Sequence, residues 1–191
     1  MTNNQSYAGF YELRNAVFSD QDAAEKLVEE NPAIVHARNS IGETALHYLA
    51  VENYITGVDW LVRHGGDINT KNDFEATPLM ESASLGYIEL CQYLLAHGAD
   101  VFVKDQNDGT VFSAASLNNS NDIDKVNLLN LLLKYAGDID LNDVFDDFEA
   151  HRALTQQSPI VVELLSSRGL KYNTEYRLGE PSGIMSHNIR L

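Results

Sequence analysis

The 191-residue sequence has few basic residues and a single cysteine. It contains 13 Lys and Arg against 28 Asp and Glu, which gives a formal net charge of −15. Because binding to phosphate groups requires clustered Lys and Arg, this balance argues against nucleic acid or an anionic membrane as a partner. The one cysteine, Cys91, has no partner for an internal disulfide. A reducing compartment is typical of such a chain, and we expect a cytoplasmic protein.

The sequence also lacks long apolar runs. None approaches the roughly 18 consecutive apolar residues that a membrane-spanning helix needs. Residues 1–6 show neither the charged nor the apolar part of a signal peptide, so we expect no secretion signal. The apolar content of 44% is normal for a folded protein, and the length suits one domain or a short repeat array.

Catalytic motifs are missing as well. The chain has no Gly-x-Ser-x-Gly turn, no phosphate-binding glycine loop and no His-Glu-x-x-His metal motif. Cys91 lies among Leu90, Leu94 and Leu95, a pattern that predicts a buried structural thiol rather than a nucleophile. We therefore expect a protein that is not an enzyme and uses no cofactor.

An internal repeat is the strongest feature that is present. Thr44, Thr77 and Thr110 are equally spaced along the chain. Two positions after each threonine stands a large apolar residue: Leu46, Leu79 or Phe112. The third copy continues in register only if an insertion within residues 119–125 is allowed. Self-similarity at one fixed period indicates a repeat architecture.

Each copy predicts two helices. The threonine is suited to cap the first helix, and Pro78 stands at a first-turn position where a missing N–H is tolerated. Apolar residues then recur at helical spacing, and Gly65 and Gly98 are placed to end the second helix with positive φ. The pattern predicts stacked helix pairs.

These motifs resemble those of the ankyrin repeat family. That family has a period of about 33 residues, which the interval from Thr44 to Thr77 matches. Its Thr-Pro-Leu-His-x-Ala signature corresponds to Thr44-Ala45-Leu46-His47 and Thr77-Pro78-Leu79. The resemblance covers residues 39–141. It implies an all-α fold, an α-solenoid of about five helix-turn-helix units with short hairpin-like turns. It also implies a structural role for His47 and, because Glu75 replaces the usual glycine, a less regular turn there.

The expected array spans residues 1–175. Its units are residues 1–38 as an N-terminal cap, then 39–71, 72–104, 105–141, and 142–175 as a C-terminal cap, with residues 176–191 as a tail. In the caps we expect helices over residues 7–17, from a cap at Ser19 to Glu30, over 142–154, and from Pro159 to Gly169.

The resemblance implies a concave face that binds another protein. Ile41 and Phe74 are one period apart and should lie on adjacent turn tips, with Val51, Leu85 and Leu117 behind them. A row of exposed apolar side chains with a polar rim is typical of binding hot spots. The alternative is that Phe74 and Leu85 pack locally. The candidate binding residues are Ile41, Glu43, Val51, Glu52, Asp73, Phe74, Ser84, Leu85, Gln106, Asn107, Leu117 and Asn118.

The acidic charge is unevenly distributed. Residues 100–149 hold 11 acidic side chains and three lysines, a net charge of −8. This segment is either a solvated face that maintains solubility or a docking surface for a protein with a basic surface. We expect a non-enzymatic interaction module, an adaptor or inhibitor that is a monomer when free. By family analogy, an immunity-type inhibitor of a basic toxin or nuclease would suit these features.

An alternative function is calcium-responsive regulation through residues 138–149. Oxygen-bearing side chains occupy positions 1, 3, 5, 9 and 12 of an EF-hand-like loop: Asp138, Asp140, Asn142, Asp146 and Glu149. Against it, Asp143 stands where the loop requires glycine, and Ile139 and Leu141 occupy positions that are normally polar.

Overall fold

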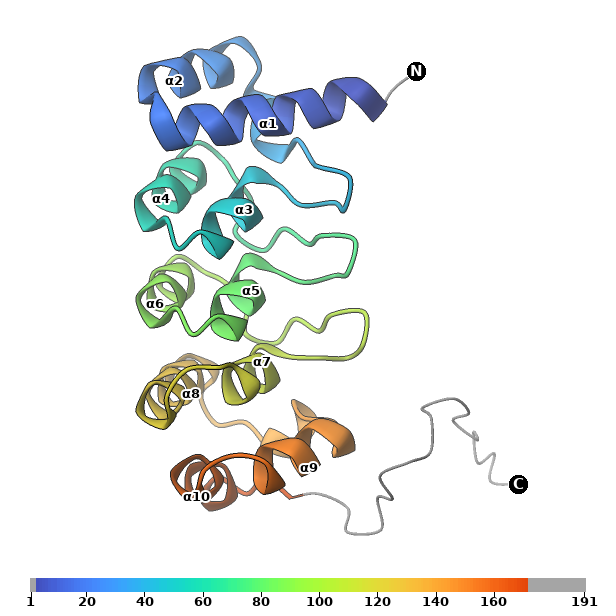
Figure 1. The fold of residues 1–191 in the computed structure, drawn as a ribbon, viewed down its shortest axis with the longest axis vertical. Helices are drawn as coiled ribbons and strands as arrows, with labels where there is room; N and C mark the ends of the chain where they lie inside the picture. Colours follow the sequence, from blue (N-terminus) through green and yellow to red (C-terminus); the bar gives the residue numbers. More distant parts are fainter. Residues whose placement is uncertain (1–2, 172–191) are drawn as a thin grey trace, which may run out of the picture.

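The computed structural model describes residues 3–171, apart from the side chains of residues 3–6, 147, 148 and 151. Within this range ten α-helices stack as five consecutive pairs into an elongated array (Figure 1). The same range contains no β-strand, so the predicted all-α solenoid is confirmed. The tail expected at residues 176–191 lies outside the described residues.

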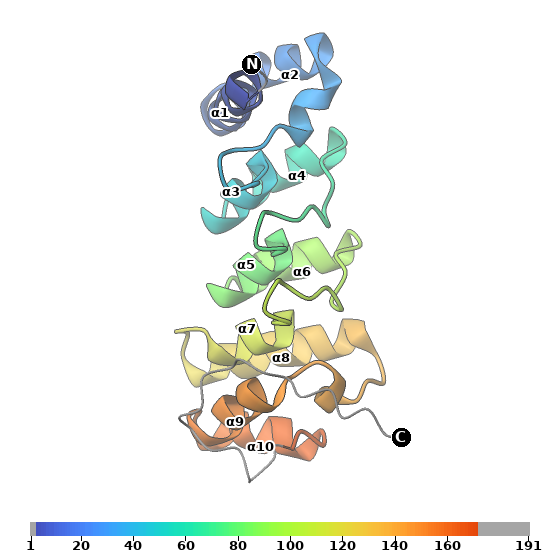
Figure 2. The same cartoon turned by 90° about the vertical axis from the view of Figure 1, so that its right-hand side faces the viewer.

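Two columns of helices run along the array (Figures 1 and 2). The first helices of the pairs are α1 (Asn3–Ser19), α3 (Ala45–Val51), α5 (Pro78–Ser84), α7 (Val111–Leu117) and α9 (Asp147–Thr155). The second helices are α2 (Gln21–Glu30), α4 (Ile55–Arg63), α6 (Ile88–Ala96), α8 (Asp122–Ala136) and α10 (Pro159–Ser167). Two short 3-10 turns, η1 (Pro32–His36) and η2 (Leu141–Asp143), precede α3 and α9.

The loops before α3, α5 and α7 project beside the first column of helices (Figure 1). Their tips are joined by backbone hydrogen bonds. The N–H of Asp73 donates to the carbonyl of Ile41 at 3.0 Å, and the N–H of Gln106 donates to the carbonyl of Phe74 at 3.0 Å. Ile41 and Phe74 therefore lie on adjacent tips, as the repeat period predicts.

The turn at Glu75 is as regular as its neighbours, so the irregularity expected there is wrong. Gly42, Glu75 and Asp108 occupy the same repeat position and have φ of +75°, +60° and +62°. In the second of these turns, Oδ1 of Asn72 accepts from the N–H groups of Phe74 and Ala76, at 2.9 and 3.1 Å. These two bonds hold the turn in shape although Glu75 must adopt the left-handed conformation.

His47 has the structural role implied by the family resemblance. Its Nδ1 accepts from the backbone N–H of Thr44 at 3.2 Å, and its Nε2 lies 3.2 Å from the carbonyl of Ala76 in the next repeat. Burial lowers the pKa of the imidazole to about 4, which keeps the ring neutral. Cys91 is also buried, as expected, and burial raises the pKa of its thiol to about 12.

Two expected helix starts are wrong. Asp20, not Ser19, caps α2 by accepting from the N–H of Ala23, while the Ser19 hydroxyl donates to the carbonyl of Asn15. The helix expected from residue 142 begins at Asp147. The preceding residues instead form η2, in which Leu141 is buried and the Asp140 side chain accepts from the N–H of Asn142, and Asp146 caps α9. The last helix ends at Ser167, just before Gly169 with φ +88°.

The insertion at residues 119–125 lengthens a helix. Helix α8 has 15 residues, whereas α4 and α6 have nine each. It begins after Asn121, whose side chain accepts from the N–H of Asp124. Lys125 in its first turn is buried and donates to Oε1 of Gln157 at 2.8 Å. The additional residues therefore form a further helical turn that packs within the array.

Two glycine substitutions test how tightly the tips are packed. A Cβ at Gly42 would lie 2.7 Å from the backbone N of Asp73, whereas a Cβ at Gly65 would meet nothing within 4 Å. Both glycines have positive φ. We expect Gly65→Ala to reduce the free energy of unfolding by about 1–2 kcal/mol from backbone strain, and Gly42→Ala to lose a further ~1–3 kcal/mol from overpacking. Urea denaturation of both variants measures the difference, and equal losses would contradict this packing.

Candidate protein-binding surface

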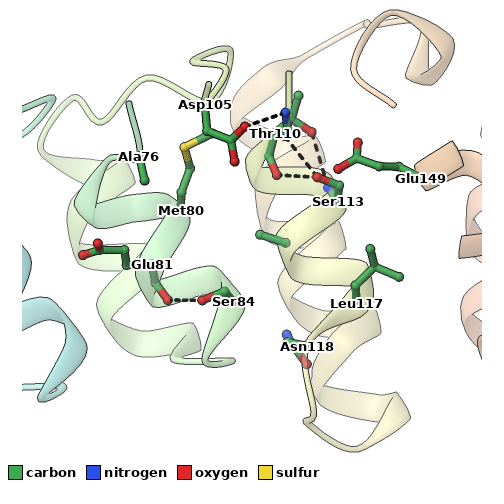
Figure 3. Close-up of a pocket in the computed structure, with 12 residues that line it drawn as sticks. Ala76, Met80, Glu81, Ser84, Asp105, Thr110, Ser113, Leu117, Asn118 and Glu149 are labelled. Carbon is green, nitrogen blue, oxygen red and sulfur yellow. Dashed lines mark hydrogen bonds between the residues drawn. The ribbon is translucent and has the colours of Figure 1, made fainter. Parts of the chain in front are cut away.

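An open groove lies between α5 and α7 and extends to α9 (Figure 3). Its volume is about 370 Å³. Small and apolar side chains line much of it, including Met80, Ala114 and Leu117, and three carboxylates share the lining: Glu81, Asp105 and Glu149. Among the described residues no Lys, Arg or His contributes to the lining. The groove therefore combines apolar contact area with acidic side chains.

The predicted apolar residues are accessible. Ile41, Val51, Phe74 and Leu85 have between 39% and 48% of their surface exposed. The alternative that Phe74 and Leu85 pack locally is therefore not supported. Leu117 is half-buried and lines the groove. The exposed apolar side chains and the groove together form a surface along the first column of helices and the turn tips.

Most of the predicted polar residues are exposed too: Glu52, Asp73, Ser84, Gln106 and Asn107. Glu43 is half-buried and accepts from the Asn39 amide at 2.6 Å. Asn118 also lines the groove, but only 6% of it is exposed. Its amide donates to the carbonyls of Ala83 and Ala115, both at 3.1 Å. It therefore ties the end of α7 to the preceding repeat.

Glu81 was missed by the sequence analysis. Its Oε1 accepts from the Asn72 amide at 3.1 Å, but its Oε2 is inaccessible and has no hydrogen-bond partner in the described part of the chain. Burial, together with the nearby charge of Glu43, raises the pKa of Glu81 to about 8. At neutral pH this side chain is therefore mainly an uncharged carboxylic acid.

Glu149 has a similar environment at the other end of the groove. It points from α9 towards Ser113 on α7 (Figure 3), and its Oε2 is likewise buried without a partner among the residues described. Burial raises the pKa of Glu149 to about 7, with added repulsion from Asp146 and Asp105. No sequence motif signals either shift, because both arise from packing between neighbouring repeats.

The calcium arrangement is not assembled in this structure. Within residues 3–171, side-chain exceptions aside, no three His, Cys, Asp or Glu side chains gather as metal ligands. Asp140 accepts from the backbone N–H and amide of Asn142, Asp146 caps α9, and Glu149 faces the groove. The donors serve separate local roles, so the geometry does not support a calcium-responsive function.

In the described part of the chain, every helix is too short or too polar to span a membrane.

The raised pKa of Glu81 predicts a pH dependence of stability. Its pKa of about 8 in the folded protein lies above the ordinary value of 4.5, so its neutral form favours folding. This contribution is complete below about pH 4.5 and is lost as the pH rises through about 8. We expect Glu81→Gln, which mimics the neutral acid, to be more stable than wild type at pH 8.5 by on the order of 1–3 kcal/mol, with little difference at pH 4.5.

Thermal melts at the two pH values check this expectation. Glu89→Gln on the exposed face of α6 is the matched control and should show no such pH-dependent gain. A gain that is equal for both variants, or equal at both pH values, would show that Glu81 is not held as a neutral acid.

Comparisons with known proteins agree with the fold. Residues 13–105 match the family described as ankyrin repeats (3 copies). A stretch of 70 residues is 36% identical to part of the serine/threonine-protein kinase VIK of Arabidopsis thaliana. That match covers 37% of this chain but only 16% of the kinase. Ankyrin repeats are typically non-enzymatic and generally mediate protein–protein interactions. The helix pairs and the family match together identify residues 13–105 of this chain as ankyrin repeats.

Proposed function

We propose that this protein is a non-enzymatic module that binds a partner protein through its turn tips and the groove between α5 and α7. The main support for this proposal is the groove. Its lining combines apolar residues with three carboxyl groups and includes no cationic residue among those described. Ile41 and Phe74 extend this surface onto the adjacent tips. Apolar anchors surrounded by polar groups supply most of the energy in protein interfaces.

The charge supports a partner with a basic surface. Residues 100–149 have a net charge of −8, and part of this segment borders the groove through Asp105 and Glu149. Complementary charge accelerates encounter and selects among partners, and its effect weakens as salt is added. Within this function we favour an inhibitor or adaptor that masks a basic protein, such as a toxin or nuclease. The free protein would be a monomer.

A paired substitution tests the binding surface. We expect Phe74→Asp/Leu85→Asp to weaken partner binding at least about tenfold, because it places charge on two apolar contact residues. The readout is affinity capture from lysate of the source organism, followed by titration of the purified partner at low and high salt. Wild-type binding should weaken as salt is raised.

The matched control is Phe102→Asp/Ile160→Asp. Both residues are exposed to a similar degree as Phe74 and Leu85. Ile160 lies on α10 and Phe102 follows α6, so both lie by the second column of helices rather than on the proposed surface. Retained affinity in this control, with circular dichroism showing that both variants are folded, would assign the loss to the proposed surface. Full affinity in Phe74→Asp/Leu85→Asp would place the binding site elsewhere.

A further inference from the structure

A second hollow lies at the N-terminal end of the array. Its volume is about 370 Å³, and it is lined by Arg14, Asn15, Phe18 and Ser19 of α1 together with Tyr48 of α3. About half of Phe18 is exposed. The hollow therefore has an aromatic wall and one cationic side chain, in contrast to the acidic groove between α5 and α7.

Aromatic rings hold the guanidinium of Arg14 in place. Its Cζ lies 4.5 Å from the ring centroid of Tyr48, 5.1 Å from that of Tyr11 and 5.9 Å from that of Phe10. Its Nε and Nη2 both donate to Oδ1 of Asn15, at 3.1 and 2.7 Å. Ring contacts of this kind restrict a long side chain. The bonds to Asn15 occupy the Nε–Nη2 edge, which leaves Nη1 and the second hydrogen of Nη2 as donors for a ligand.

Arg14 also forms no ion pair with any side chain that the structure describes. Salt bridges of 4.0 Å or less join Arg63 to Asp59, His64 to Glu25, and Lys71 to Glu75. Arg14 is distinguished from the other cations outside these salt bridges by its place in a hollow and by the aromatic rings around its guanidinium. Its Nη1 makes no hydrogen bond to another described residue, so the guanidinium has donors to offer a ligand.

The repeat register places this hollow in line with the groove. Tyr48 stands one repeat period before Glu81, and Ala114 stands one period after it, so the three occupy the same repeat position on successive helices. The Arg14 guanidinium lies over the ring of Tyr48. The groove between α5 and α7 is lined instead by Glu81, Asp105 and Glu149. The lining therefore changes from a cationic side chain to acidic side chains along the surface proposed to bind a partner.

We propose that the Arg14 hollow is an anchoring subsite for an acidic side chain of the partner, flanked by an apolar residue that packs on Phe18. This inference rests on the proposed protein-binding function and adds the direction in which the partner lies along the array. A guanidinium pairs with a carboxylate through two parallel hydrogen bonds, which fixes direction as well as position. A partner segment would lie with its acidic end at α1 and its basic end at α7 and α9.

Two short peptides test the subsite directly. The probes are acetyl-Phe-Glu-Phe-amide and its neutral counterpart acetyl-Phe-Gln-Phe-amide, titrated into the full chain and followed by NMR. We expect the glutamate peptide to shift the Arg14 Nε–H and Tyr48 ring signals and to bind at least about fivefold more tightly than the glutamine peptide.

Variants assign this preference to Arg14. Arg14→Gln should abolish the preference, and Arg14→Lys should reduce it, because an ammonium has neither the planar fork nor the same stacking on aromatic rings. Arg63→Gln is the matched control, since Arg63 is exposed and already paired with Asp59 on α4. It should retain the full preference, and amide spectra would verify that each variant is folded.

Three results would overturn the subsite: equal affinity for the two peptides, a preference that survives in Arg14→Gln, or no shift of the Arg14 and Tyr48 signals at millimolar peptide. None of them bears on the Phe74→Asp/Leu85→Asp experiment, which changes other residues and uses the partner itself. A failure of the subsite is therefore distinguishable from a failure of the proposed function.

Discussion

The stacking of each helix pair on the next is the constraint on which this structure depends. Helices α3, α5 and α7 have only seven residues each, far fewer than the ~12–15 that an isolated helix needs to be even marginally stable in water. Leu46, Leu79 and Phe112, one on each of these helices, are almost completely buried. Burial of such a side chain contributes about 1.5–3 kcal/mol. The order of each unit therefore depends on its neighbours.

Hydrogen bonds between successive loops also fix the distance between neighbouring repeats. The Arg38 guanidinium donates to the carbonyl of Gly42 in its own loop and to the carbonyl of Lys71 in the next, each at 2.5 Å. Nδ2 of Asn69 similarly donates to the carbonyl of Gly98, one repeat further on. These bonds satisfy loop carbonyls and hold the tips at a regular separation. The exposed side chains are thus presented by loops on a rigid scaffold.

Burial also changes the electrostatics of the binding surface. The formal charge of −15 counts every carboxylate as ionised, but the pKa values of Glu81 and Glu149 are raised to about 8 and 7. The groove is therefore less negative at neutral pH than its composition indicates. A cation that enters it would favour ionisation of both groups and release protons. The charge of the groove therefore responds to its occupant.

The amino-acid sequence was sufficient to predict the repeat, the helix pairs and the adjacent placement of Ile41 and Phe74, because these depend on local signals that recur in each copy. The burial of Asn118, the neutral state of Glu81 and the aromatic surroundings of Arg14 became visible only in the folded array. Each of these arises where one repeat packs on another. Helical periodicity indicates which face of an element is apolar, but desolvation and ring contacts depend on atoms contributed by a neighbouring element, whose side chains the local pattern does not specify.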